Sequence, residues 1–356
     1  MAYTTIDDPT EYFHTQIYAG DGNDDRSITN DANAGNFKPD WLWIKNRSST
    51  NGHALVDTTR GATKVIRSQA SNAEETESNA IQAFETDGFQ IGTSGLVNTS
   101  SNNYVAWQWV ANGGTTSSNS DGNITSTVQA NTTAGFSIVT FTGNGNNDAT
   151  IGHGLGTTPA MIITKNRDDS VLWRVWHQDL TSTNVLFLNE DFAQTAPSGH
   201  SNGYIKTVGS STYSVYQGNS DTNGVNGSGD DMIAYCFAEK QGYSKIGSYV
   251  GNGNADGTFV YTGFKPAWIL IKRMDSTTSW RIIDSKRDTR NGCEARLFPD
   301  NTDAENLSAL VLDILSNGFK IKSTNGGVNN SDSDYIYMAF AEHPFVSSKG
   351  VPVTAR

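Results

Sequence analysis

The sequence Phe37-Lys38-Pro39-Asp40-Trp41-Leu42-Trp43-Ile44-Lys45 has the pattern of a buried strand introduced by a proline and closed by a lysine. Two further copies of this strand occur in the chain, at 158–165 and 265–272. In each copy the lysine stands six residues after the proline. A strand that recurs three times with constant internal spacing indicates a repeat protein.

Other markers keep their spacing around each copy. An aromatic residue and a Gly-Asn/Asp-Gly-Asn sequence precede every core strand, at 18–23, 141–146 and 249–254, and such residues favour a turn because they tolerate positive φ. Each copy also has a Val-Asn pair whose valine lies twelve residues before an aromatic residue. That aromatic belongs to a closing strand in which large side chains alternate with smaller ones, as in Val105, Trp107 and Trp109. This period of two predicts that the large side chains share one face.

Both faces of the core strand are apolar. Trp41 and Trp43 fall on one face, while Leu42 and Ile44 fall on the other. A sandwich strand normally has one solvated face, so the second face must be covered by a helix, a neighbouring repeat or another subunit. Tryptophans of the following strand, Trp173, Trp176 and Trp280, could pack in the core or form a platform for a sugar ring, and the equivalent positions of Trp173 and Trp280 favour the core.

The predicted fold class is all-β, with three tandem antiparallel β-sandwich domains of jelly-roll or concanavalin-like type. We expect these domains at 1–112, 135–242 and 243–343, followed by a tail at 344–356. The segment 113–134 is rich in Gly, Ser, Thr and Asn and is interpreted as a linker. Because the join near Gly242 is short, the second and third repeats should form a near-rigid pair, with the first placed more independently. The segments 71–84 and 303–315 could each be helix or strand.

Composition excludes several functions. The chain has 356 residues, with 37 Asp and Glu against 25 Lys and Arg and a formal net charge of −12, which argues against nucleic acid as a main partner. No apolar run is long enough for a membrane helix, and the N-terminus does not have the pattern of a signal peptide. The two cysteines suggest neither a disulfide framework nor a metal site.

The chain shows no recognisable catalytic set, and no cofactor is expected. Asp57 and Asp284 each precede an arginine by three residues, and His177 replaces them in the second repeat. A local ion pair at the surface is the preferred interpretation, and a ligand contact is the alternative. The candidate ligand-binding residues are Trp176, His177, Asp57, Arg60, Asp284 and Arg287. A calcium site at Asp21, Asp24 and Asp25 is a weaker hypothesis than solvated turn carboxylates, because a standard calcium loop would require glycine where Arg26 stands.

Several longer motifs resemble virion proteins of marine tailed bacteriophages. The N-terminus at 1–9, the core strand with Asn46 and Arg47, and the run 57–64 are similar to the first domain of those proteins. The sequence Gly135-Phe136-Ser137-Ile138-Val139, followed by 152–159, resembles the module that they repeat, and the C-terminal run from Ala341 is also similar. The second repeat departs from the pattern at His177 and in a longer polar loop around 218–229.

This resemblance implies a non-enzymatic virion structural protein with concanavalin- or laminin-G-like sandwich modules. The expected function is a tail-fibre or appendage adhesin that contacts host-surface glycan. A capsid or tail decoration protein is the alternative, and a polysaccharide-degrading enzyme is a weaker one, because no carboxylate pair stands out. The expected partners are other virion proteins, further copies of the chain (a trimer being favoured) and host-surface polysaccharide. The expected location is the virion, after assembly in the host cytoplasm.

Overall fold

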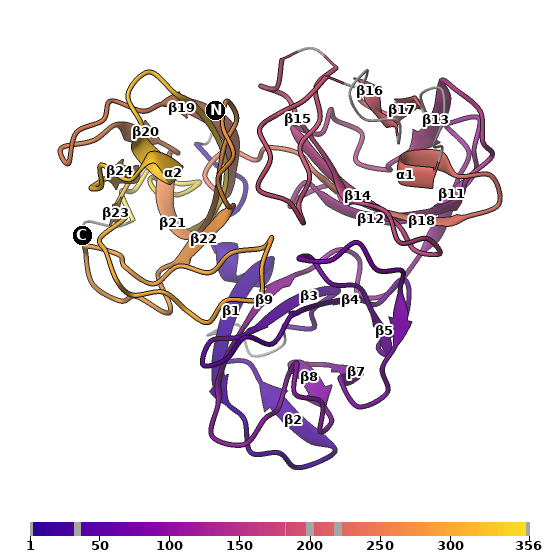
Figure 1. The fold of residues 1–356 in the computed structure, drawn as a ribbon, viewed down its shortest axis with the longest axis horizontal. Coiled ribbons are helices and arrows are strands. Elements are labelled where there is room, and N and C mark those ends of the chain that lie inside the picture. Colours follow the sequence, from indigo (N-terminus) through magenta and orange to yellow (C-terminus); the bar gives the residue numbers. More distant parts are fainter. Residues whose placement is uncertain (1–2, 32–36, 182, 197–202, 217–222, 354–356) are drawn as a thin grey trace.

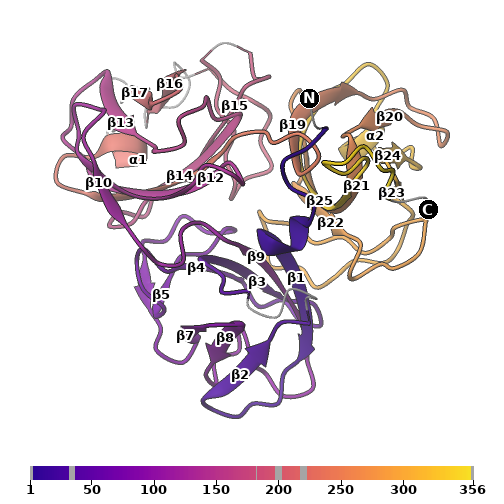
Figure 2. The same cartoon turned by 180° about the vertical axis from the view of Figure 1, so that it is seen from behind.

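The computed structural model describes residues 3–31, 37–181, 183–196, 203–216 and 223–353. The chain forms three lobes around a common centre (Figures 1 and 2). In each lobe a four-stranded arrangement lies toward the centre and a three-stranded sheet lies at the periphery. All of the pairings between the named strands are antiparallel, which confirms the prediction of an all-β sandwich fold. We call the lobes repeats 1, 2 and 3.

Repeat 1 shows the plan of all three. After the 3-10 turn η1 (Pro9–Glu11), its inner sheet has the order β1-β9-β3-β4 and its outer sheet the order β2-β8-β7. The closing strand therefore pairs with both the first strand and the core strand. The strands are β1 (Phe13–Ala19), β2 (Arg26–Thr29), β3 (Trp41–Asn46), β4 (His53–Asp57), β5 (Lys64–Val65), β6 (Glu75–Thr76), β7 (Ile81–Glu85), β8 (Gly88–Ile91) and β9 (Asn103–Trp109).

Repeats 2 and 3 follow the same order of strands, and repeat 2 adds two strands at one edge of its inner sheet. Repeat 2 contains β10 (Ser117–Asn119), β11 (Ser126–Asn131), β12 (Phe136–Thr142), β13 (Ala149–Gly152), β14 (Met161–Asn166), β15 (Arg174–His177), β16 (Tyr204–Val208), β17 (Thr212–Tyr216), α1 (Asn223–Asn226) and β18 (Asp231–Phe237). Repeat 3 contains β19 (Ser244–Val250), β20 (Phe259–Tyr261), β21 (Phe264–Arg273), β22 (Arg281–Asp284), β23 (Leu312–Leu315), β24 (Gly318–Ile321), α2 (Gly326–Asn329) and β25 (Asp334–Pro344).

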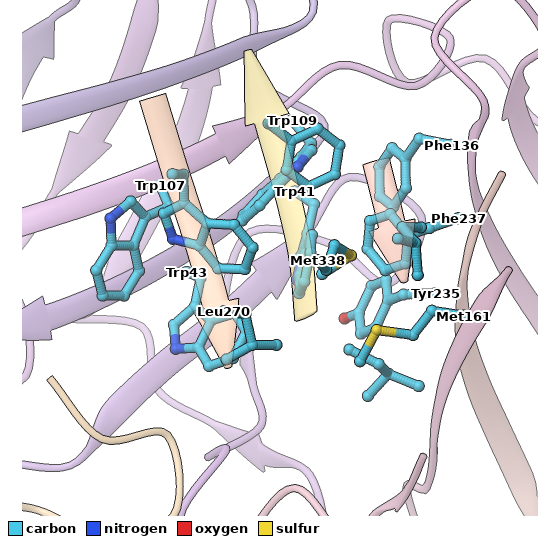
Figure 3. Close-up of a cluster of buried hydrophobic side chains, with 14 of the residues drawn as sticks. Trp41, Trp43, Trp107, Trp109, Phe136, Met161, Tyr235, Phe237, Leu270 and Met338 are labelled. Atoms are coloured by element: carbon cyan, nitrogen blue, oxygen red, sulfur yellow. The ribbon is translucent and has the colours of Figure 1, made fainter. Parts of the chain in front are cut away.

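The two faces of each inner sheet have different partners. Leu42 and Ile44 pack inside repeat 1 against its outer sheet. Trp41 and Trp43 point the other way, into a cluster of buried side chains that all three repeats share. Figure 3 shows this central core, where the side chains of the core and closing strands of the three repeats meet. Neighbouring repeats of the same chain therefore cover the second apolar face, which was one of the three possibilities left open by the sequence.

The Val-Asn marker is explained by a brace on the opening turn. In repeat 1 the Asn98 side chain accepts hydrogen bonds from the backbone N–H groups of Asp21 and Gly22, and it donates to the carbonyls of Asn23 and Gly92. Asn226 and Asn329 make the same kind of contact with the turns of their own repeats. One buried amide thus joins each opening turn to the segment that precedes the closing strand.

We expect Asn98→Ala to lower the free energy of unfolding by about 1–3 kcal/mol, because it leaves buried backbone groups without their partners. Urea denaturation followed by tryptophan fluorescence measures this loss. The exposed neighbour Ser100 provides the control, since Ser100→Ala should change stability by less than about 0.5 kcal/mol. Equal effects of the two substitutions would contradict the brace.

The linker prediction for 113–134 is wrong over most of its length. β10 and β11 form a hairpin in this segment, and β11 pairs with β12 of repeat 2. The side chain of Gln129 is buried and donates to the hydroxyls of Thr58 and Thr59 in repeat 1. The alternation of Ser126 and Val128 with exposed Thr127 is too short and too polar to stand out from the surrounding Gly and Ser residues.

Two other expectations are resolved by the packing. The described part of 303–315 contains no helix and ends in strand β23, and 71–84 contributes strands β6 and β7.

The expectation that repeats 2 and 3 form a pair with repeat 1 placed independently is wrong, because the central core takes large side chains from all three repeats. The length of a connecting segment did not predict how tightly the repeats pack.

Candidate functional site

The charged motif of repeat 1 lies in the interface with repeat 2. Arg60 Nε contacts Asp57 Oδ2 at 2.6 Å, and Arg60 Nη1 contacts Glu74 Oε2 at 2.9 Å. Arg167 of repeat 2 binds both oxygens of Glu74, each at 2.9 Å. The hydroxyl of Tyr235, also from repeat 2, donates to Asp57 Oδ2 at 2.8 Å. Two cations and two carboxylates therefore balance in one network, and the side chains of Asp57 and Arg60 are fully buried.

Repeat 3 makes the same network with repeat 1. Arg287 Nε contacts Asp284 Oδ2 at 2.6 Å, and Arg287 Nη1 contacts Glu305 Oε1 at 2.8 Å. Arg47 of repeat 1 forms the two-pronged pair with Glu305, and the indole N–H of Trp107 donates to Asp284 Oδ2 at 2.9 Å. Each interface is therefore head-to-tail, with one repeat supplying the Asp-Arg-Glu set and the next supplying an arginine and an aromatic donor.

The electrostatics favour the charged forms in both networks. Burial alone lowers the pKa of Arg60 and Arg287, but the neighbouring carboxylates more than compensate and hold both pKa values above the ordinary range. Burial likewise raises the pKa of Glu74 and Glu305, and the paired arginines reverse that effect and lower both values. A buried pair of this kind tolerates desolvation because every charge has a partner with hydrogen-bond geometry.

The interface between repeats 2 and 3 replaces this network with apolar and neutral residues. His177, Leu180 and Gln194 take the places of the Asp-Arg-Glu set, while Met274 and Met338 take the places of the arginine and the aromatic donor. Gln194 N–H still donates to the Met274 carbonyl at 2.8 Å, as Glu74 does to Arg167 and Glu305 to Arg47. The backbone contact is common to all three interfaces, and only the side-chain chemistry differs.

A second recurring contact links each repeat to its neighbour. The indole N–H of Trp173 donates to the Arg67 carbonyl at 2.9 Å, and that of Trp280 donates to the Phe187 carbonyl at 2.8 Å. His53 occupies the equivalent position in repeat 1, and its Nε2 lies 2.9 Å from the Phe298 carbonyl. Trp173 and Trp280 are buried, as the sequence favoured. These side chains therefore help to close the ring of repeats.

The lysine that ends each core strand is buried. Lys45 and Lys165 donate to backbone carbonyls of the turn that follows, and Lys272 donates to the carbonyl of Asp191 in repeat 2. Burial lowers the pKa of Lys165 to about 7 and the pKa of Lys45 and Lys272 to about 8. Their ammonium groups act as fixed donors at the ends of the core strands.

His177 has an incomplete set of partners. Its Nδ1 accepts from the backbone N–H of Asp179 at 3.1 Å, while its buried Nε2 lies near the Tyr337 backbone without a well-formed hydrogen bond. Burial lowers the pKa of His177 to about 4, and it lowers the pKa of His53 to about 3. Both rings are therefore neutral in the folded protein at pH 7.

The lowered pKa of His177 predicts that the folded protein loses stability in acid. The unfolded state binds a proton at His177 below its ordinary pKa of about 6.5, whereas the folded state does so only below about 4. Because the unfolded state holds more protons between these values, the free energy of unfolding should fall as pH drops from about 6.5 to about 4, by on the order of 3 kcal/mol from His177. Urea denaturation at several pH values measures the slope. His177→Asn should reduce the slope without abolishing it, because buried His53 has a lowered pKa as well and contributes in the same direction. An unchanged slope would contradict the assignment.

Burial argues against the ligand-contact alternative for most of the candidate residues. The side chains of Asp57, Arg60, Asp284 and Arg287 have no exposed surface, and His177 is buried as well. The ion pairs do form within each repeat, but the next repeat covers them. Trp176 is only partly buried and packs against the core of repeat 2, so its role as a sugar platform stays a prediction.

The calcium hypothesis gains no support from the described residues, which contain no group of three or more acidic, His or Cys side chains arranged for a metal. Asp21 accepts from the backbone N–H of Asn23 and pairs with Arg26, and Asp24 accepts from the Gln82 side chain. These carboxylates stabilise turns.

The sequence did not reveal the residues that complete each network from the neighbouring repeat. Arg47 and Arg167 both stand two places after the core lysine, where repeat 3 has Met274. Glu74 and Glu305 lie in segments of different length, so their equivalence is visible only in three dimensions. The sequence did contain one signal of this pairing. In the interface of repeats 2 and 3, methionine replaces the arginine of the other interfaces and glutamine replaces their glutamate, so the two residues change together.

Repeat 3 carries two exposed aromatic side chains on one strand of its outer sheet. Phe259 and Tyr261 on β20 are 44% and 53% exposed. The pairing of the outer sheets places Ser27 and Thr29 at these positions in repeat 1, and Thr150 and Gly152 in repeat 2. The hydroxyl of Tyr3 lies 3.3 Å from that of Tyr261 and donates to the Gly263 carbonyl. This aromatic patch, defined as Tyr3, Phe259 and Tyr261, is the clearest surface feature that the repeat pattern does not explain.

A family model described as a domain of unknown function, DUF7483, matches residues 8–344. The chain belongs to the DUF7483 family. No curated protein and no solved structure matches it.

The DUF7483 match runs from Asp8 in the segment before β1 to Pro344 at the end of β25, so it includes all three repeats. The region matched by the family model is thus the whole three-repeat body rather than a single sandwich. No helix in the described part of the chain has the length and apolar character needed to cross a membrane.

Proposed function

We propose that this protein is a non-enzymatic structural protein of a bacteriophage virion, and that it acts as a tail-fibre or appendage adhesin contacting host-surface glycan. One observation carries the proposal. The recurring charged and aromatic residues are used to join the repeats, which leaves the outward-facing strands and loops of each repeat available for recognition. A rigid body with variable outer loops is the arrangement typical of recognition proteins.

The aromatic patch of repeat 3 supports glycan as the ligand class. Exposed tyrosine and phenylalanine rings provide apolar faces on which a sugar ring can stack, and the Tyr3 and Tyr261 hydroxyls can exchange hydrogen bonds with sugar hydroxyls. The resemblance to marine phage virion proteins supports the virion assignment. Neither argument depends on a catalytic group.

Antibody labelling of purified virions tests this function. An antibody against the protein, visualised by gold particles in electron microscopy, should label fibres or other appendages. Soluble protein should also bind host cells and lose that binding when surface polysaccharide is removed enzymatically. Labelling that is absent from the virion would overturn the proposal.

A decoration protein is the second candidate, and the shape of the molecule favours it. Three equivalent lobes around one axis form a compact pseudo-threefold body, which is suited to sites of threefold or near-threefold symmetry on a particle (Figure 1). In this case the gold label would lie on capsid or tail faces, and the soluble protein would not bind host polysaccharide.

The need to cover an apolar sheet face no longer supports a homotrimer. The apolar second face of each inner sheet is already covered by the other repeats, so no second chain is required to bury it. Association with further copies and with other virion proteins stays a proposal, and sedimentation velocity at several protein concentrations tests the first of these.

A further inference from the structure

Repeat 3 contains a small pocket lined by two arginines. Arg281 comes from β22 and Arg296 from the loop before β23, and they face Ser323, Asn325 and Val328 across the pocket. Arg281 lies deeper, and Arg296 lies closer to solvent. The pocket is separate from the two charged interfaces described above.

Arg281 has donor capacity that the protein does not use. Its Nη2 donates to the Asn325 side chain at 3.0 Å, but its Nη1 is buried without any hydrogen-bond partner. Unlike Arg60 and Arg287, it forms no ion pair with any described carboxylate. A buried guanidinium donor without a partner costs free energy, and an anion bound to it would offset that cost.

Arg296 adds a second positive charge at the mouth of the pocket. Its guanidinium donates to the Ala309 carbonyl at 2.8 Å and to the Ser308 hydroxyl at 3.1 Å, which are both neutral acceptors. Burial and the proximity of Arg296 lower the pKa of Arg281, and burial lowers the pKa of Arg296. The carboxylate of Asp300 opposes the pKa shift of Arg281, and that of Glu294 opposes the pKa shift of Arg296, but neither lies close enough to form an ion pair. An anion between the two guanidinium groups would relieve their repulsion.

Among the described residues, neither of the other repeats shows the same arrangement. Ala54 stands at the equivalent of Arg281 in repeat 1, where Leu96 occupies the place of Gly327 and packs in the same core cluster as Ala54. In repeat 3 a Cβ added at Gly327 would lie 1.6 Å from Arg281 Nη1, so the glycine makes room for the guanidinium. The equivalent Arg174 of repeat 2 is used differently, because it donates to the carbonyls of Leu172 and Gly203 and lies over the Phe187 ring.

We propose that Arg281 and Arg296 bind one anionic group, the carboxylate or sulfate ester of an acidic host-surface polysaccharide. Two guanidinium groups that converge on one pocket suit the paired oxygens of either anion, and the Ser323 and Asn325 side chains supply further polar contacts. This inference rests on the proposed adhesin function and names its ligand class. The aromatic patch lies on the same repeat, so a polysaccharide chain could contact both features.

Long-range electrostatics oppose a polyanion, because the protein carries a formal net charge of −12. Binding must therefore come from the local site, and it should be measured at physiological ionic strength, where charges farther apart than about 8 Å are largely screened. Under these conditions non-specific repulsion contributes little and the two arginines dominate.

The test is isothermal titration of the full-length protein with three probes: oligoalginate, which carries carboxylates, a short dextran sulfate, and neutral dextran of the same length. One or both acidic probes should bind, and neutral dextran should bind at least tenfold more weakly. Arg281→Gln and Arg296→Gln should each weaken acidic binding roughly tenfold or more. Arg290→Gln removes an exposed arginine from the same repeat and should leave the affinity unchanged.

The preference between oligoalginate and dextran sulfate distinguishes the two anions. Failure of both acidic probes to bind, or equal binding by wild-type protein and both pocket variants, would overturn the pocket assignment. Circular dichroism checks that each variant is folded, and Arg296→Gln keeps the test valid if Arg281→Gln is unstable, because Arg296 is closer to solvent. If the protein still binds host polysaccharide while both variants bind like wild type, the adhesin function stands and the ligand site lies elsewhere.

Discussion

Replacing Arg287 by leucine should lower the free energy of unfolding by about 3–5 kcal/mol, because it leaves Asp284 buried without a cation and deprives Glu305 of one of its two. Leucine is the residue that the chain itself places at this position in repeat 2, as Leu180. The loss therefore arises from the unpaired charges rather than from an unsuitable shape. Chemical denaturation of Arg287→Leu measures it.

The chain also offers a matched rescue. The combined variant Asp284→His, Arg287→Leu, Glu305→Gln and Arg47→Met copies four of the five side chains of the neutral interface into the interface of repeats 3 and 1, and it leaves Trp107 in place. It should recover most of the stability lost in Arg287→Leu, because no charge is left unpaired. Lys206→Met breaks an exposed pair with Asp148 and should cost at most about 1 kcal/mol. A similar small cost for Arg287→Leu would show that its ion pair is solvated.

Trp41→Ala should destabilise the whole chain by about 3–5 kcal/mol or more, since it removes one of the largest side chains of the central core. The indole lies 4.5 Å from Trp109 in its own repeat and 4.3 Å from Tyr235 in repeat 2, measured between ring centroids. The damage should therefore spread beyond repeat 1, and unfolding should stay a single transition that shifts to lower temperature.

Two buried thiols allow the destabilisation of repeats 2 and 3 to be measured. Cys236 belongs to repeat 2 and Cys293 to repeat 3, and neither has exposed surface. In Trp41→Ala the rate at which a thiol reagent modifies both cysteines should rise, because opening of the shared core exposes them together. Unchanged rates, with separate melting of repeat 1, would contradict a common core.

The sequence predicted the fold class because its evidence is local. The proline-to-lysine strand, the Val-Asn pair and the alternation of Val105, Trp107 and Trp109 each depend on spacing within one repeat. The two apolar faces of β3 also correctly indicated that something covers the inner sheet. What covers it depends on how repeats pack, and no spacing within a repeat encodes that.

The candidate site was misinterpreted for the same reason. Asp57 and Arg60 form the expected pair, but its burial depends on Glu74, Arg167 and Tyr235, two of which come from another repeat. A charged pair at a strand end is usually solvated, so the sequence favoured a surface pair of little energetic importance. The unpaired donor of Arg281 was likewise invisible, because it results from the size exchange with Gly327 across two elements.

Three repeats of this one chain close into a single rigid ring. Spin-label distance measurements test it most directly, with labels on pairs of cysteines introduced at the equivalent positions Ser27, Thr150 and Phe259 of the three outer sheets. The native cysteines are buried and should stay unlabelled in the folded protein. A rigid ring predicts a narrow distance distribution for each of the three pairs, with similar mean distances. Broad distributions for both pairs that include Ser27, with a narrow one between Thr150 and Phe259, would contradict it.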